Sequence, residues 1–203
     1  MVLLGSTVAY ASDAPAVGRA TNGQLPQPRT ASAADTSRSP GPFVRGSVGI
    51  EFGLGLLDEA WNLNGSREGL VEGSVSVWWA FLNRATLVVD VHATRVFQQP
   101  SRDAFVTGVT PGVRFQIVRR EPWDLFAEIG VGPSWSDTVV PPRGTRFNYL
   151  GHTGIGLSRR LGRQVHGIAG FRWLHLSNNG REGHDRNPDI QAVGGYAAVT
   201  VGF

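Results

Sequence analysis

The chain has no cysteine, no lysine and no long apolar run. Without cysteine, disulfide bridges and thiolate metal sites are excluded. No run reaches the roughly 18 apolar residues of a membrane-spanning helix, but a spanning β-barrel stays open, because its strands need only about 10 residues of alternating polarity. All 19 basic residues are arginine and lie scattered over the chain. Nucleic-acid binding needs a concentrated basic stripe, so we expect no nucleic-acid partner.

Glycine and aromatic residues are plentiful, and the first part of the chain differs from the rest. The opening MVLLGSTVAYA has a short apolar core and then the small-x-small pattern Ala9-Tyr10-Ala11 of a signal-peptide cleavage site, but no charged region precedes it. We therefore predict a partial signal peptide over residues 1–11. Residues 12–42, rich in Ala, Ser, Pro and Gly, are predicted to be a disordered leader, and residues 43–203 the folded domain.

From residue 43 onward the apolar residues recur with period two, as in strands. We predict eight strands, near 43–56, 69–82, 85–97, 104–119, 123–136, 145–159, 164–177 and 189–203. Hairpin-like connections between successive strands favour an antiparallel up-and-down β-barrel. The predicted fold class is therefore all-β, an eight-stranded transmembrane barrel.

The two faces of these strands differ sharply. One face collects large apolar side chains, such as Phe52, Trp79 and Ile129. The other carries charges of both signs, which are Arg45, Glu51, Glu72, Asp90, Arg114, Glu128 and Arg172. In a soluble barrel the apolar face would line a ligand cavity, whereas in an outer-membrane barrel it would meet lipid and the charges would pair inside. The balance of interior charge and the absence of lysine favour the membrane barrel.

Three further features favour a bacterial outer membrane as the location. The predicted connections alternate between short turns and longer loops, and aromatic residues gather near both ends of the apolar face, as in the two girdles of such barrels. The chain also ends in AAVTVGF. Its terminal Phe203 is similar to the signal that the barrel assembly machinery recognises, so we expect that machinery as a partner. A homodimer stays open.

The segment RWLHLSNNG contains the candidate chemistry. His175 and Ser177 lie two positions apart in the outward register of the seventh strand, and Asp189 and Gln191 share that register in the eighth. Pairing of the two strands would bring Asp189 or Gln191 close to His175. A serine activated by a histidine that a third group orients is the arrangement of acyl-transfer sites. The alternative is that these are ordinary polar residues at a strand end.

Asn178 and the backbone amides near Gly180 follow the serine directly. Amide donors at such a position can stabilise the oxyanion of an ester-hydrolysis intermediate. We therefore take Asn178 and Gly180 as the oxyanion and substrate residues. The inward His92 and His152 could suggest a metal site, but a hydrogen-bonded network accounts for them better, and no metal ligands are assigned.

The motif HLSNNG, followed by RNPDIQAVGGYAAVTVGF as the closing strand, resembles the lipid A 3-O-deacylase (PagL-type) family. The resemblance covers about the last 35 residues, and the rest agrees as an eight-stranded barrel. It implies hydrolysis of the ester-linked 3-hydroxyacyl chain at position 3 of lipid A, by a Ser–His–Glu triad without a cofactor. His175 would be the base, Ser177 the nucleophile and Asn178 the oxyanion-side residue, with lipopolysaccharide of the outer leaflet as substrate.

One position departs from the family pattern. Where the family places the acidic triad residue, this chain has Gln191. An amide can orient an imidazole but cannot stabilise imidazolium with a full charge. Asp189 is the nearest substitute, with Glu182 and Asp185 as weaker ones. The predicted function is a lipid A 3-O-deacylase, and the alternative is a structural or adhesion barrel without turnover.

Overall fold

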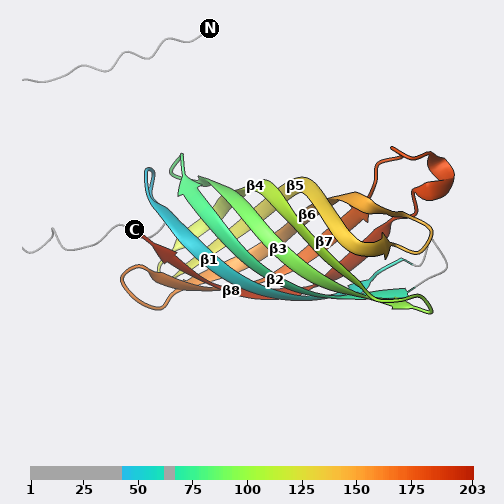
Figure 1. Cartoon of the computed structure of the whole chain (residues 1–203). Coiled ribbons are helices and arrows are strands. Elements are labelled where there is room, and N and C mark those ends of the chain that lie inside the picture. Colours follow the sequence, from blue (N-terminus) through green and yellow to red (C-terminus); the bar gives the residue numbers. More distant parts are fainter. Residues whose placement is uncertain (1–42, 62–66) are drawn as a thin grey trace, which may run out of the picture. The chain divides into compact units, whose positions relative to one another are not determined.

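The computed structural model describes residues 43–61 and 67–203, which form a closed barrel of eight antiparallel strands (Figure 1). The strands are β1 (Val48–Glu59), β2 (Arg67–Ala80), β3 (Ala85–Gln99), β4 (Ala104–Arg120), β5 (Trp123–Val140), β6 (Thr145–Arg160), β7 (Val165–Ser177) and β8 (Ile190–Gly202). Each strand pairs with the next, and β8 closes the ring on β1. A short 3-10 helix, η1 (His184–Arg186), lies in the β7–β8 loop. The predicted signal peptide and leader lie outside the described residues.

The predicted eight-stranded fold is confirmed, and the strand boundaries differ mainly at two places. β1 begins at Val48 rather than at residue 43, because the backbone turns at Gly46 with φ of +92°. The preceding Phe43 is buried against Trp78 and His166, with ring centroids 5.3 and 5.8 Å away. Arg45, which was expected to point into the barrel, is exposed in this segment.

The outer ends of β3 and β5 also extend beyond their predicted limits. β3 runs to Gln99 and β5 to Val140, so that only residues 100–103 and 141–144 remain as connections. These are as short as the 81–84 turn at the opposite end. The expected asymmetry in loop length is therefore carried mainly by the β7–β8 loop, residues 178–189, which projects beyond the neighbouring connections in Figure 1.

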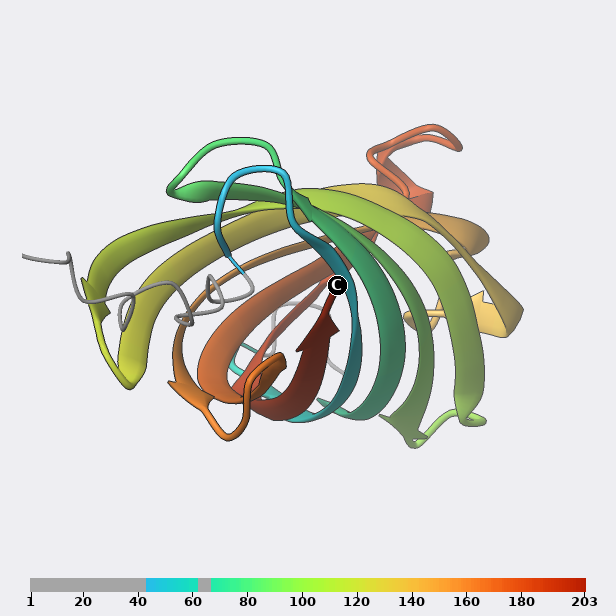
Figure 2. The same cartoon turned by 90° about the vertical axis from the view of Figure 1, so that its left-hand side faces the viewer.

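The apolar face of the strands is the outer face of the barrel. Large apolar side chains in this register are exposed, among them Leu54 at 72% and Ile129 at 64%, whereas the charged residues of the alternate register are buried. Figure 2 views the ring of strands from the end at which the C-terminus lies. An exposed apolar wall around a polar interior is the pattern of a barrel in lipid, so the soluble-barrel alternative is wrong. None of the helices in the described part of the chain is both long and apolar enough to span a bilayer.

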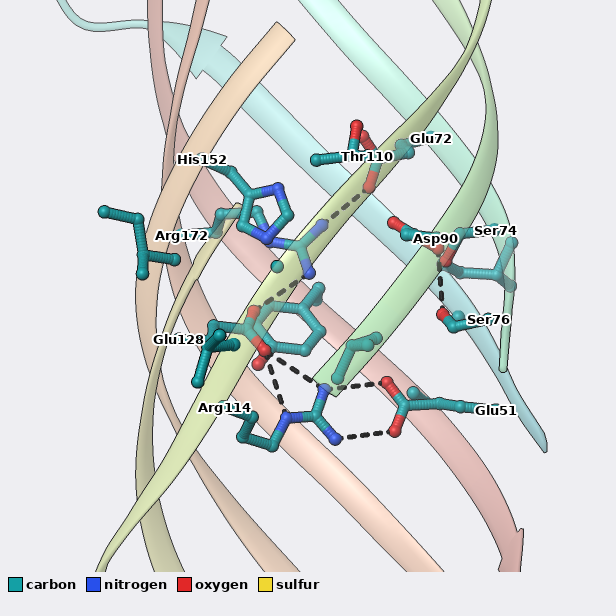
Figure 3. A pocket seen from close by; sticks show the side chains of 18 residues that line it. Glu51, Glu72, Ser74, Ser76, Asp90, Thr110, Arg114, Glu128, His152 and Arg172 are labelled. Carbon is teal, nitrogen blue, oxygen red and sulfur yellow. Dashed lines mark hydrogen bonds and ion pairs between the residues drawn. The ribbon is translucent and has the colours of Figure 1, made fainter. Parts of the chain in front are cut away.

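Two arginines and three glutamates form an ion-pair network that fills the middle of the barrel (Figure 3). Arg114 donates to both carboxylate oxygens of Glu51, at 2.7 and 2.9 Å, and to Glu128 at 3.0 Å. Arg172 joins Glu128 to Glu72 at 2.9 and 2.8 Å. The cavity among these side chains is only about 20 Å³, little more than the space of one water molecule. The interior is therefore a packed polar core.

Toward the long loop, the interior also contains an apolar layer, beside buried polar residues such as Glu68 and Gln98. A cluster of buried residues includes Leu174 and Leu176 of β7; its other members are Leu57, Leu70, Val96, Ala104, Val106, Val140, Leu150, Ile190 and Ala192. The alternating pattern predicts only polar and small residues in the inward register, so this apolar layer differs from the expectation. Because Leu174 and Leu176 alternate with Trp173, His175 and Ser177, the apolar layer anchors the strand whose other face carries the candidate site.

Candidate active site

The end of β7 presents His175 and Ser177 side by side on the outer wall. His175 Nε2 lies 2.9 Å from Ser177 Oγ. The pleat of the strand sends both side chains to the same face, while Leu176 between them is fully buried on the other. The imidazole is one-third exposed and the serine is buried. A base and a hydroxyl are thus within hydrogen-bond distance at the outer, loop-bearing end of the lipid-facing wall.

The paired strand β8 supplies the groups on the far side of the imidazole. His175 is the register partner of Gln191, and Nδ1 lies 2.8 Å from the Gln191 side-chain nitrogen. That nitrogen also donates to Asp189 Oδ2 at 2.5 Å. Asp189 Oδ2 is itself 3.6 Å from His175 Nδ1. Both residues expected near the imidazole are therefore there, and they contact each other.

Aromatic residues flank the histidine and the serine. The Trp173 ring stacks on the His175 ring, with centroids 5.9 Å apart and planes inclined by 24°. Tyr149 of β6 is the register partner of Ser177. The sequence predicts the aromatic residues at this end of the apolar face as part of an interfacial girdle and gives them no part in the site. The position of Trp173 in the sequence could have revealed its role, because residues two apart in a strand lie on the same face and His175 is two residues later.

Asn178 and Gly180 lie just beyond the serine, where the chain leaves β7. The buried Asn178 side chain donates to Thr145 Oγ1 at 3.2 Å and to the Arg186 backbone carbonyl at 2.5 Å. Its oxygen accepts the Gly180 N–H at 2.9 Å. Gly180 has φ of +72°, in the left-handed region that glycine adopts without strain. The expected oxyanion donors are thus engaged in holding the loop to the end of β6.

The weaker acidic substitutes have other places in the structure. Glu182 pairs with Arg186 at 2.8 Å across one turn of the loop. Asp185 is exposed in η1. Neither is among the groups that contact His175. Within residues 43–61 and 67–203, no group of three or more His, Asp or Glu side chains has the arrangement of a metal site.

A family model described as lipid A 3-O-deacylase (PagL) matches residues 46–200, which is most of the chain. The chain belongs to this family. Membership, together with the lipid-facing wall, places it in the bacterial outer membrane. The match includes the strand that carries His175 and Ser177, so the family resemblance of the closing segment extends through the whole barrel. No curated protein matches the sequence significantly.

Solved structures with the same architecture include both an enzyme and other membrane proteins. Neisserial surface protein A superposes with a TM-score of 0.58 at 14% identity, covering 78% of this chain and 100% of its own. OprG from Pseudomonas aeruginosa gives 0.51 at 11%, covering 79% and 97%. The outer-membrane enzyme PagL gives 0.50 at 16%, covering 75% and 98%. At these identities the likeness establishes the barrel fold alone.

Proposed function

We propose that this chain hydrolyses the 3-O-linked 3-hydroxyacyl ester of lipid A, with Ser177 as nucleophile and His175 as general base. The observation that carries the proposal is the 2.9 Å contact between His175 Nε2 and Ser177 Oγ on the lipid-facing wall. Family membership supports the reaction class. An esterase whose nucleophile faces the outer leaflet reaches an acyl ester without extracting the lipid from the membrane.

The chemistry proceeds in two acyl transfers. Ser177 Oγ attacks the ester carbonyl while His175 Nε2 accepts its proton, and the tetrahedral intermediate collapses as the imidazolium gives that proton to the leaving 3-oxygen of the sugar. Water then attacks the acyl-serine while His175 accepts a proton from it, and the imidazolium returns that proton to Ser177 Oγ as the 3-hydroxy fatty acid leaves. Each step needs an imidazole whose Nε2 is unprotonated at the start and whose Nδ1–H has an acceptor.

Asp189 is the acceptor that we assign to Nδ1–H. A carboxylate both fixes the tautomer and stabilises the imidazolium formed during attack, which a neutral amide cannot do. Its Oδ2 lies 3.6 Å from Nδ1, slightly beyond a hydrogen bond, and the Gln191 amide nitrogen holds it from the other side. A Ser–His–Asp triad forms when this carboxylate replaces the Gln191 nitrogen, now 2.8 Å from Nδ1, as the neighbour of Nδ1–H. Gln191 is then the positioning residue that holds Asp189, where the family has its acid.

Asn178 is a positioning residue in this proposal. Its amide hydrogens are used on Thr145 and on the Arg186 carbonyl, and the Gly180 N–H is used on Asn178 itself. These bonds fix the chain immediately after the nucleophile and so shape the oxyanion side of the site. An Asn178→Ala substitution should therefore slow turnover through loss of loop geometry rather than through loss of a direct donor.

The decisive experiment is a mass spectrum of lipid A from a Gram-negative host with and without the protein. We expect the loss of one 3-hydroxyacyl group, abolished by Ser177→Ala and by His175→Ala. Heat-modifiable migration of both variants on gels would show that the barrel still folds. An unchanged spectrum with a folded wild-type barrel would favour the non-catalytic structural barrel, to which the amide at Gln191 already lends some support.

A further inference from the structure

A surface pocket lies beside the nucleophile, on the side away from Asp189 and Gln191. Its volume is about 400 Å³, and we call it the outer pocket; it is lined by Trp135, Thr145, Phe147, Asn178, Arg181 and Glu182. This volume is within the range of about 300–1,000 Å³ typical of small-molecule sites. Asn178 is the direct neighbour of Ser177, so the outer pocket adjoins the site.

The strand register places the outer pocket on the aqueous side of the nucleophile. Tyr149 is the partner of Ser177, and from there β6 runs back through Phe147 to Thr145 at the loop end of the barrel. Phe147 is in turn the partner of Trp135 on β5. A lipid whose ester carbonyl lies at Ser177 and whose acyl chain follows the apolar wall would therefore direct its headgroup into the outer pocket.

Arg181 is held across the aromatic floor of the outer pocket. Its guanidinium carbon lies 5.1 Å above the Phe147 ring centroid, and one nitrogen donates to the Tyr149 hydroxyl at 3.1 Å. In the part of the chain that the structure describes, Arg181 forms no ion pair with a carboxylate, whereas nearby Glu182 is neutralised by Arg186. The guanidinium thus keeps donors for an anion, and arginine binds phosphate through two parallel N–H bonds.

The remaining wall suits a sugar ring. Trp135 is 57% exposed and packs against Phe147 with centroids 6.3 Å apart. A broad, fixed indole face presents the apolar surface on which the C–H face of a pyranose ring stacks. An aromatic face beside an unneutralised arginine is therefore complementary to a sugar that carries a phosphate.

We propose that the outer pocket binds a phosphorylated glucosamine of the substrate, with the sugar ring on Trp135 and a phosphate on Arg181. This inference deepens the proposed deacylase function and rests on it for the placement of the ester. It makes Arg181 a specificity-determining residue, which distinguishes a phosphorylated glycolipid from other acyl esters of the outer leaflet.

The test measures binding without turnover. Full-length Ser177→Ala protein in detergent micelles is titrated by calorimetry with hexa-acylated lipid A and with the same lipid A after enzymatic removal of its phosphates. Adding Arg181→Gln should weaken binding of the phosphorylated lipid by about 10-fold or more, the range expected for lost charge-assisted hydrogen bonds, and leave binding of the dephosphorylated lipid unchanged. Trp135→Leu should weaken both.

Arg95→Gln is the matched control. Arg95 also lies over an aromatic ring, with its guanidinium carbon 5.8 Å from the Phe97 centroid, but on β3, a strand that contributes nothing to the outer pocket. It should bind both lipids as the background does. Equal loss for both lipids with Arg181→Gln, or equal loss with Arg95→Gln, would overturn the proposal. Because binding is measured in an inactive background, a wild-type chain that cleaves nothing would count against the deacylase function alone.

Discussion

The side chains of His175 and Gln191, 16 residues apart in the chain, face each other across the β7–β8 pair with their nitrogens 2.8 Å apart. An amide that donates to Nδ1 keeps the proton on Nε2, which is the wrong tautomer for a base toward Ser177. Catalysis therefore requires an acceptor at Nδ1, and Asp189 is the carboxylate within reach.

The first prediction separates the two residues beside the imidazole. Asp189→Asn should lower kcat by about 100-fold or more, because it removes the charge that stabilises imidazolium. Gln191→Ala should cost roughly 10-fold or less, since it removes one neutral hydrogen-bonding group. Rates of 3-hydroxy acid release from lipid A micelles decide between them, and the reverse ranking would refute the assignment of Asp189.

The second prediction exchanges the two functional groups. In Asp189→Asn/Gln191→Glu the carboxylate moves to the position nearest Nδ1, and the amide that supports it moves to residue 189. We expect kcat to recover to within about 10-fold of the wild type, which corresponds to about 1.4 kcal/mol in the activation barrier. This is far above the kcat expected for Asp189→Asn alone. Gln191→Glu alone should perform less well than the double variant, because two carboxylates would then lie in contact. A double variant no faster than Asp189→Asn would argue against a charge requirement.

Trp173 is predicted to hold the imidazole in place. A stacked aromatic pair contributes about 0.5–1.5 kcal/mol, so Trp173→Leu should lower kcat by roughly 2- to 10-fold with little change in KM. Phe171→Leu is the matched control, because Phe171 lies on the same face of β7 but one strand repeat further from His175. Similar losses in both variants would assign the effect to the lipid-facing surface rather than to the stack.

The interior network should be needed for stability rather than for chemistry. Arg114→Met would leave Glu51 without its partner in the core and should lower the free energy of unfolding by about 3–5 kcal/mol. Arg114→Met/Glu51→Gln should recover part of this loss, since the unpaired charge is gone. Urea unfolding of the refolded barrel in liposomes measures both, and a single variant as stable as the wild type would contradict the role of the network.

Phe43 is predicted to stabilise the end of the barrel opposite the active site. Its buried ring packs on Trp78, whose indole N–H donates to Thr200 Oγ1 at 2.7 Å. Phe43→Ala should destabilise the barrel by about 3 kcal/mol, as for other buried phenylalanines. The deacylation rate per folded molecule should be unchanged. Heat-modifiability gels measure the folded fraction, and lipid A assays measure the deacylation.

The sequence by itself determined the number of strands and the sorting of their side chains onto two faces, because period-two alternation assigns every strand residue to one side or the other. Which face meets lipid followed from the balanced charges of the polar face and the absence of lysine. The same parity put His175 and Ser177 together, since residues two apart in a strand are neighbours whatever the partner strands do. Alternation could not show that the interior contains an apolar layer around Leu174 and Leu176. It separates the two faces of a strand but does not compare positions at different heights along the barrel.

Only the tertiary structure decided what surrounds the histidine. Register between β7 and β8 depends on the length and path of the loop that joins them, and this brought Gln191 opposite His175 with Asp189 behind it. Register between β6 and β7 likewise put Tyr149 beside Ser177, and the path of the loop laid Arg181 across Phe147. Such contacts between strands and loops depend on how distant segments align in space, which local alternation along one strand does not specify.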